Sequence, residues 1–144
     1  MPTELHYHEE SDLMHTRAFG RVVKEDLLGH PAAQIASFPQ EGAHLYELLD
    51  AREVEGVDVS ILGIVAHVPR MFSQLRYFDG VSLAILSDED WVYGQANQLA
   101  ALFARSSVRI RVFRVEAEAM AWLDDQRAAR NALIEAEARS AGGA

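Results

Sequence analysis

The stretch Leu48–Gly63, LLDAREVEGVDVSILG, decides the fold because two kinds of secondary structure meet in it. Its first residues complete an apolar run, HLYELLD (44–50), that is typical of a strand. Its last residues begin DVSILGIVAHVPRMF (58–72), whose apolar side chains have helical spacing and whose Asp58 is a good N-cap. The acidic segment between them is expected to be a loop. Passage from strand through loop to helix predicts one unit of an α/β fold.

The residues before this stretch predict a hairpin followed by a helix. LHYHEE (4–9) alternates apolar and polar residues, and LMHTRAFG (13–20) follows it after a tight polar turn at Ser11–Asp12. VVKEDLLGHPAAQIASF (22–38) has near-helical apolar spacing, but Gly29 and Pro31 interrupt it. We therefore expect a helix that is weak or kinked near residue 30.

The residues after the stretch predict two strands that alternate with three helical segments. Pro69 weakens the helix of residues 58–72 or begins a short second one. The later elements are a buried central strand, SLAILS (82–87), an amphipathic helix capped by Asp88 or Asp90, WVYGQANQLAALFARS (91–106), an edge strand, RIRVF (109–113), and a long helix (116–140).

This order of elements predicts one α/β domain. Its mixed sheet has about five strands, with an N-terminal hairpin and parallel later strands, and about four helices cover it. We assign residues 1–126 to the domain and residues 127–144 to a helical C-terminal extension with a frayed end.

The composition excludes several classes of partner. The 144 residues carry 13 basic and 22 acidic side chains, a formal charge of −9 that is unsuited to nucleic acid or an anionic membrane. The chain has no cysteine, which excludes disulfides and thiolate chemistry. The first residues show no signal-peptide pattern and no apolar run approaches the length of a membrane span, so we expect a cytoplasmic protein.

Two local patterns carry a family resemblance. Residues 58–63, Asp-Val-Ser-Ile-Leu-Gly, resemble the helix start Asp-Ser-Ser-Gly-Leu-Gly of STAS domains in anti-sigma-factor antagonists and of the related SpoIIAA-like family of small bacterial proteins. Four residues match, and Val59 and Ile61 depart. RVFRVEAEAMAWLDD (111–125) is similar to the last strand and the Ala-x-x-Trp-Leu helix of the same family. Together with the element order, the resemblance covers roughly residues 4–126 and implies a STAS-like, SpoIIAA-like fold.

The resemblance also implies a regulatory function through another protein. In such antagonists the second serine of the motif accepts a phosphate that blocks partner binding, and this role would fall on Ser60. In this hypothesis Asp58 is the N-cap of the helix, and Arg52 is a counter-charge for the phosphate on Ser60. Asp50 belongs to the same partner-binding surface. The alternative is an exposed, silent serine in the first helical turn, because Val59 and Ile61 depart from the motif. The phosphate would also lie among several carboxylates.

A second hypothesis is a carrier of an apolar, lipid-like ligand. Large apolar side chains lie in or beside the connections between elements and could line a pocket: Met71, Phe72, Tyr77, Phe78, Trp91 and Tyr93. The same residues also suit the rim of a core or a protein interface.

Catalytic and metal sites find no support in the sequence. His6, His8 and His15 fall on one face of the hairpin, where surface histidines are the better interpretation, and we expect no metal and no cofactor. Ser60 and His67 are two helical turns apart, too far for a nucleophile and its base. We therefore expect a protein that is not an enzyme.

Leu133 and Ile134 have no obvious target within the chain, so a homodimer through the C-terminal helix is a further hypothesis.

Overall fold

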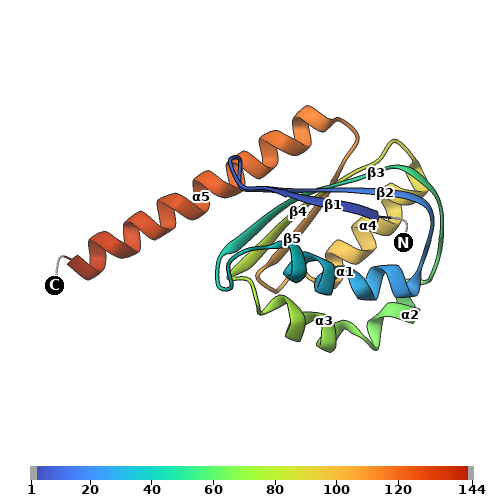
Figure 1. Ribbon diagram of the computed structural model, residues 1–144, viewed down its shortest axis with the longest axis horizontal. Helices are drawn as coiled ribbons and strands as arrows, with labels where there is room; N and C mark the ends of the chain where they lie inside the picture. The colour runs from blue at the N-terminus through green and yellow to red at the C-terminus, as the bar shows by residue number, and fades with distance from the viewer. Residues whose placement is uncertain (1–2, 143–144) are drawn as a thin grey trace.

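Five strands form one sheet, in the order β1-β2-β3-β4-β5, in the computed structural model, which describes residues 3–142 (Figure 1). The strands are β1 (Thr3–His8), β2 (Leu13–Val23), β3 (His44–Asp58), β4 (Gly80–Leu86) and β5 (Val108–Phe113). The pair β1–β2 is antiparallel and the other three pairs are parallel. The predicted hairpin, the mixed sheet and the edge position of the last strand are confirmed.

Five helices cover both faces of the sheet. They are α1 (Lys24–Ser37), α2 (Ile61–Val65), α3 (Val68–Leu75), α4 (Asp90–Leu102) and α5 (Glu116–Gly142). The parallel strands follow one another in the sheet as they do in the chain, so the crossover helices α1 to α4 lie on one face. The helix α5 lies on the opposite face (Figure 1).

The sheet therefore separates two hydrophobic cores. Leu45 of β3 faces the larger core beneath α1 to α4, whereas its neighbours Tyr46 and Leu48 belong to the smaller core beneath α5. All seven residues of β4 are buried, as expected for a central strand with both faces covered. Ala119 and Leu123 of α5 close the smaller core.

The strand β3 is longer than the sequence predicts. We expected a loop at residues 51–57, but β3 continues to Asp58 and pairs with the end of β2, where Val23 lies opposite Asp58. Ala51 and Val54 are buried in the larger core, while Arg52, Glu53 and Glu55 are exposed. The acidic composition marks the outward face of a strand and not a loop.

Two other local expectations also change, and a third is confirmed. The helix α1 continues through Pro31, which is buried, so packing outweighs the hydrogen bond that proline removes. Neither Asp88 nor Asp90 caps α4, because Glu89 is its N-cap and Asp90 is its first residue, paired with Arg114. The sequence 58–72 forms two helices, α2 and α3, with Pro69 in the first turn of the second, as the proline suggested.

The helix α5 projects well beyond the body of the molecule (Figure 1). It extends without interruption past residue 126, so the expected end of the domain falls inside it. Arg127 donates to the backbone oxygen of Asp12 at 2.8 Å, and Arg130 pairs with Asp79 at 2.5 Å. Beyond these two contacts, residues 131–142 are exposed. Among residues 3–142, no helix is long and apolar enough to cross a membrane.

Candidate functional site

Ser60 lies on the surface between β3 and α2. It is the N-cap of α2, and its Oγ accepts a hydrogen bond from the backbone N–H of Gly63 at 3.1 Å. The sequence assigned this cap to Asp58, which is wrong. Asp58 instead accepts a hydrogen bond from Arg21 Nε at 2.9 Å, and this contact lowers the pKa of the carboxyl. The hydroxyl of Ser60 is thus exposed beside an ion pair.

Arg52 is not a counter-charge for Ser60. Its guanidinium binds Asp50 at 2.9 Å and 2.7 Å, and these hydrogen bonds lower the pKa of Asp50 although partial burial opposes the shift. Six of the seven residues between Arg52 and Ser60 belong to β3, whose extended backbone from Arg52 to Asp58 alone spans roughly 20 Å. Asp58 is thus only two residues from Ser60 in the chain, whereas Asp50 and Arg52 lie well away from it along β3.

Exposed apolar side chains lie beside Ser60. Leu62 on α2 is 85% exposed, and Val65 on the same helix is 44% exposed. Val23, which pairs with Asp58 in the β2–β3 register, is 36% exposed. These residues, Ser60, Leu62, Val65 and Val23, are called the α2 surface below.

The aromatic residues proposed as a ligand pocket do not gather at one place. Phe78 is buried against Phe38, with ring centroids 5.3 Å apart, and the Tyr77 hydroxyl lies 3.4 Å from the Phe38 oxygen. Phe72 packs on Phe103, Trp91 is 39% exposed, and Tyr93 lies beneath Arg114. Only Met71 of the proposed set lines the internal cavity described next.

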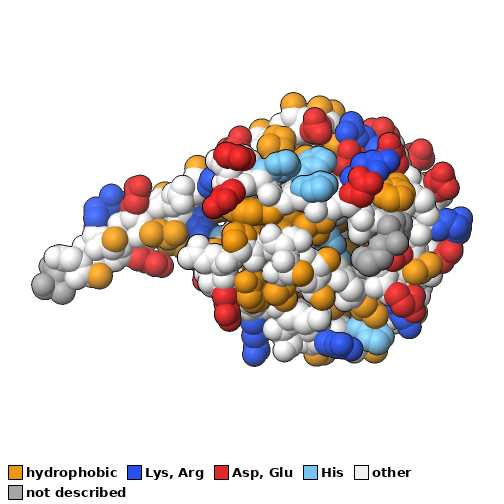
Figure 2. Space-filling view, viewed as in Figure 1, with side chains coloured by type: hydrophobic (Ala, Val, Ile, Leu, Met, Phe, Trp, Pro, Cys, Tyr) orange, Lys and Arg blue, Asp and Glu red, His pale blue; other side chains and the backbone are white. Residues whose placement is uncertain are grey.

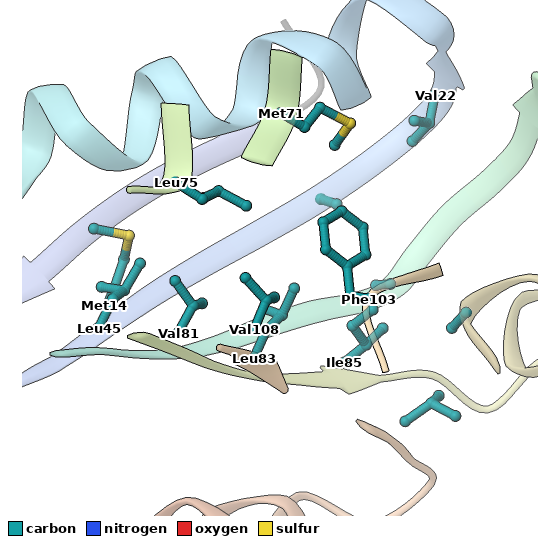
Figure 3. Close-up of a cluster of buried hydrophobic side chains, with 14 of the residues drawn as sticks. Met14, Val22, Leu45, Met71, Leu75, Val81, Leu83, Ile85, Phe103 and Val108 are labelled. Atoms are coloured by element: carbon teal, nitrogen blue, oxygen red, sulfur yellow. The ribbon is translucent and has the colours of Figure 1, made fainter. Parts of the chain in front are cut away.

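A cavity of about 170 Å³ lies in the larger core, between the sheet and the helices α1 to α4. Its walls are almost wholly aliphatic and aromatic, with Met71 and Leu75 on the helical side and Val81, Leu83 and Val108 on the sheet side (Figure 3). Ala18 and Ala51, on the neighbouring strands β2 and β3, also line it. Small side chains at these two positions leave space that larger ones would fill.

A surface groove of about 300 Å³ between α2 and α4 adjoins the cavity. Six side chains line both spaces: Leu27, Val57, Ile64, Ile85, Val92 and Leu99. Ser60 also lines the groove. The groove and the cavity thus share part of their lining, and Ser60 connects the groove to the α2 surface.

Polar groups are concentrated on one side of the cavity. Apart from Thr3, the polar residues of the lining, Asp26, His30 and Gln34, all belong to α1. His30 and Gln34 are one helical turn apart and both bind Glu47 of β3, which is fully buried. Glu47 Oε2 lies 2.8 Å from His30 Nε2, and Glu47 Oε1 accepts from Gln34 Nε2 at 2.5 Å.

The surroundings of Glu47 favour its charged form. A third contact, from Thr16 Oγ1 at 2.7 Å, completes its set of partners. Burial works against the charge, but His30 and the three hydrogen bonds outweigh it and hold the pKa of Glu47 below its usual value. Burial likewise opposes protonation of His30, yet Glu47 raises the pKa of that imidazole. Both shifts therefore favour an imidazolium–carboxylate contact between the two side chains.

Sequence reasoning missed this cluster, although two signals were present. Glu47 is a charged residue in an otherwise apolar strand, at the same spacing as the inward-facing Leu45 and Leu49. His30 and Gln34 share one face of α1, the helix that precedes β3 in the chain. A buried charge predicts nearby partners, but the sequence does not identify them.

The hairpin histidines form a separate surface feature. His6 lies directly opposite His15 in the β1–β2 register, and histidine side chains gather over the hairpin (Figure 2). Within residues 3–142, no group of three or more His, Asp or Glu side chains has an arrangement that could hold a metal ion.

Comparison with known proteins identifies the fold. No family model and no curated protein matches the sequence. One similar solved structure is that of an uncharacterized protein of the DUF3478 family with a SpoIIAA-like fold, from Shewanella loihica PV-4. The two chains are 15% identical and superpose with a TM-score of 0.54 over 84% of this chain and 91% of the other. The chain therefore has a SpoIIAA-like α/β fold, as the resemblance implied.

Proposed function

We propose that this protein binds a small apolar molecule in the cavity between the sheet and α1 to α4, as a carrier or sensor without catalytic activity. The observation that carries the proposal is the cavity of about 170 Å³ with nearly all-apolar walls. Protein interiors normally contain few voids larger than a water molecule. An apolar cavity of roughly 150 Å³ is large enough to bind benzene, so this one suits a compound of that size.

Toluene is a suitable probe, with binding measured by calorimetry or ligand-detected NMR. Ala51→Leu adds a larger side chain at the cavity wall and is expected to weaken toluene binding at least tenfold. Filling the cavity should also stabilise the fold by about 1 kcal/mol. The matched control Ala128→Leu adds the same atoms at an exposed position on α5 and should leave binding unchanged. The wild-type protein failing to bind toluene, or Ala51→Leu binding it normally, would contradict the proposal.

A second candidate function is regulation through a protein partner, as the STAS resemblance implies. It is favoured by the α2 surface, where an exposed hydroxyl lies beside Leu62, which is 85% exposed. A phosphate on Ser60 would add about −1.5 to −2 charges next to Asp58. The nearby basic side chain, Arg21, already forms an ion pair with Asp58. Phosphorylation would therefore change the charge of an apolar surface and weaken association with an apolar partner.

Intact mass measurement tests this candidate. Incubation with ATP and a lysate of the source cells should add one phosphate, and Ser60→Ala should abolish the addition. Ser73→Ala, at an exposed serine on α3, is the matched control and should leave it intact. In a pull-down, Ser60→Asp should release the partner that the wild-type protein retains. Absence of added mass together with an unchanged pull-down would exclude the switch.

A further inference from the structure

The polar side of the cavity indicates the class of ligand, an inference that rests on the proposed function. We propose that the cavity takes an uncharged apolar compound with a single hydroxyl group, an alcohol or phenol of about benzene size, and that Gln34 and His30 bind this hydroxyl. The proposal follows from how Glu47 positions these two side chains and from the chemistry of the remaining walls.

Glu47 determines which atoms of Gln34 and His30 are occupied. Its carboxylate can only accept, so the amide group that faces it at 2.5 Å must be the NH2 of Gln34. The amide oxygen of Gln34 is then directed away from Glu47 and receives no side-chain or backbone hydrogen bond from residues 3–142. One acceptor thus remains on a residue that lines the cavity.

His30 supplies the complementary donor. Its Nε2 is held by Glu47 at 2.8 Å, which leaves Nδ1, the other ring nitrogen, without a hydrogen-bond partner in the described part of the chain. Both nitrogens of an imidazolium are donors. A hydroxyl group can donate to the Gln34 oxygen and accept from His30 Nδ1–H at the same time, which neither a hydrocarbon nor a ketone can do.

The remaining walls favour an uncharged ligand. Outside α1 the lining is aliphatic and aromatic apart from Thr3, so a charged group would lose its hydration without compensation. A carboxylate would also meet Asp26, another residue of the lining, and lie close to Glu47. The volume of about 170 Å³ limits the compound to about the size of a single ring.

Phenol and toluene form a matched pair of probes because they differ by a hydroxyl in place of a methyl group. The quantity to measure is the ratio of the Kd for toluene to the Kd for phenol. A hydrogen bond to the ligand is worth a factor of roughly five in affinity. Gln34→Leu should therefore lower this ratio about fivefold, mainly by weakening phenol binding. The control Gln126→Leu, on α5 at the other face of the sheet, should leave the ratio unchanged.

The outcomes separate the two proposals. Both probes binding with a ratio that Gln34→Leu does not change would overturn the hydroxyl assignment and leave the proposed function intact. Neither probe binding to the wild-type protein would overturn both. Since Gln34→Leu removes a partner of Glu47 and could impair folding, the wild-type side-chain amide signal of Gln34 provides a second measurement. Both aromatic rings should shift that signal, but phenol should shift it more because its hydroxyl bonds the amide oxygen; equal shifts would also overturn the assignment.

Discussion

At the scale of single residues, a buried and a half-buried ionisable group on opposite faces of β3 behave differently. Glu47 faces the larger core and is stabilised in its charged form by three neighbouring side chains. His44, three residues earlier, lies on the side of α5 and hydrogen-bonds Ser82 Oγ at 2.9 Å. Burial, aided by the Arg130 charge, lowers the pKa of His44 to about 4. The first group contributes to stability when charged and the second when neutral.

Glu47→Ala should destabilise the fold strongly. The change leaves His30, Gln34 and Thr16 without their common acceptor inside the core, and removal of one member of a buried pair costs about 3–5 kcal/mol. Urea denaturation followed by circular dichroism measures the loss. Glu55→Ala, an exposed position on the same strand, serves as the control and should change stability little. Equal stability of the two variants would show that the Glu47 contacts contribute nothing net.

The low pKa of His44 predicts a loss of stability in acid. An unfolded histidine titrates near pH 6.5 and the folded one near pH 4, so the unfolded chain binds more protons between these values. The free energy of unfolding should therefore fall as the pH drops from about 6.5 to about 4. After allowance for solvent screening, we expect a slope of at most about 1 kcal/mol per pH unit.

Urea denaturation from pH 4 to 7 checks this slope. His44→Gln keeps a hydrogen-bonding group near Ser82 but removes the titration, and it should flatten the pH dependence. His8→Gln, at an exposed position of β1, should retain the wild-type slope. Parallel curves for wild type and His44→Gln would contradict the assignment.

At the scale of elements, the helices differ in how much of their surface packs against the sheet and how much is exposed. The helix α1 tolerates Pro31 because its inner face packs on the sheet and supplies His30 and Gln34. The five-residue α2 begins at a capped end and exposes Leu62. The helix α5 contacts the body through its first four turns, as far as Arg130, and then leaves it (Figure 1).

Truncation should locate the end of the stabilising part of α5. A chain that ends at Arg130 loses residues 131–144, of which 131–142 are exposed, and should unfold at the wild-type temperature, within about 2 °C. A chain that ends at Gln126 also loses Arg127, whose guanidinium lies 4.4 Å from the Tyr46 ring centroid, and the Arg130–Asp79 pair. This shorter chain should unfold several degrees lower in a thermal denaturation scan. Equal melting temperatures of the two chains would place the domain end before Arg127.

At the scale of the whole molecule, the two faces of the sheet present different surfaces. One face carries the layer of α1 to α4 with the cavity inside it, and the other carries α5 alone. The projecting part of α5 exposes Leu133 to 60% and Ile134 to 44%, among charged side chains (Figure 2). These are the apolar residues on which the homodimer hypothesis rests, and it stays a prediction.

We expect the full chain to form a dimer through this part of α5. Leu133→Glu combined with Ile134→Glu should give a monomer, because charged side chains would be buried in the contact. Light scattering that gives the mass of each species checks the expectation against the 16.0 kDa of one chain. The control Ala128→Glu places a charge nearer the body and should remain dimeric. A wild-type monomer, or a dimer that persists in the double variant, would dismiss this contact.

Local pattern was sufficient for most of the architecture. Three patterns in the sequence depend only on which nearby residues are buried: the apolar run in β4, the alternation in the hairpin and the helical periodicity of α4 and α5. The order of these elements in the chain implies that the later strands are parallel. Local pattern was misleading at residues 51–57, where outward acidic side chains of β3 resembled a loop.

The contacts that matter for function join residues far apart in the chain, and only packing decides them. Glu47 contacts Thr16, His30 and Gln34 because β2 pairs with β3 and α1 packs on the sheet at this point. The extended backbone of β3 separates Arg52 from Ser60. The cavity is the volume that many side chains together leave unfilled, so no short segment encodes it.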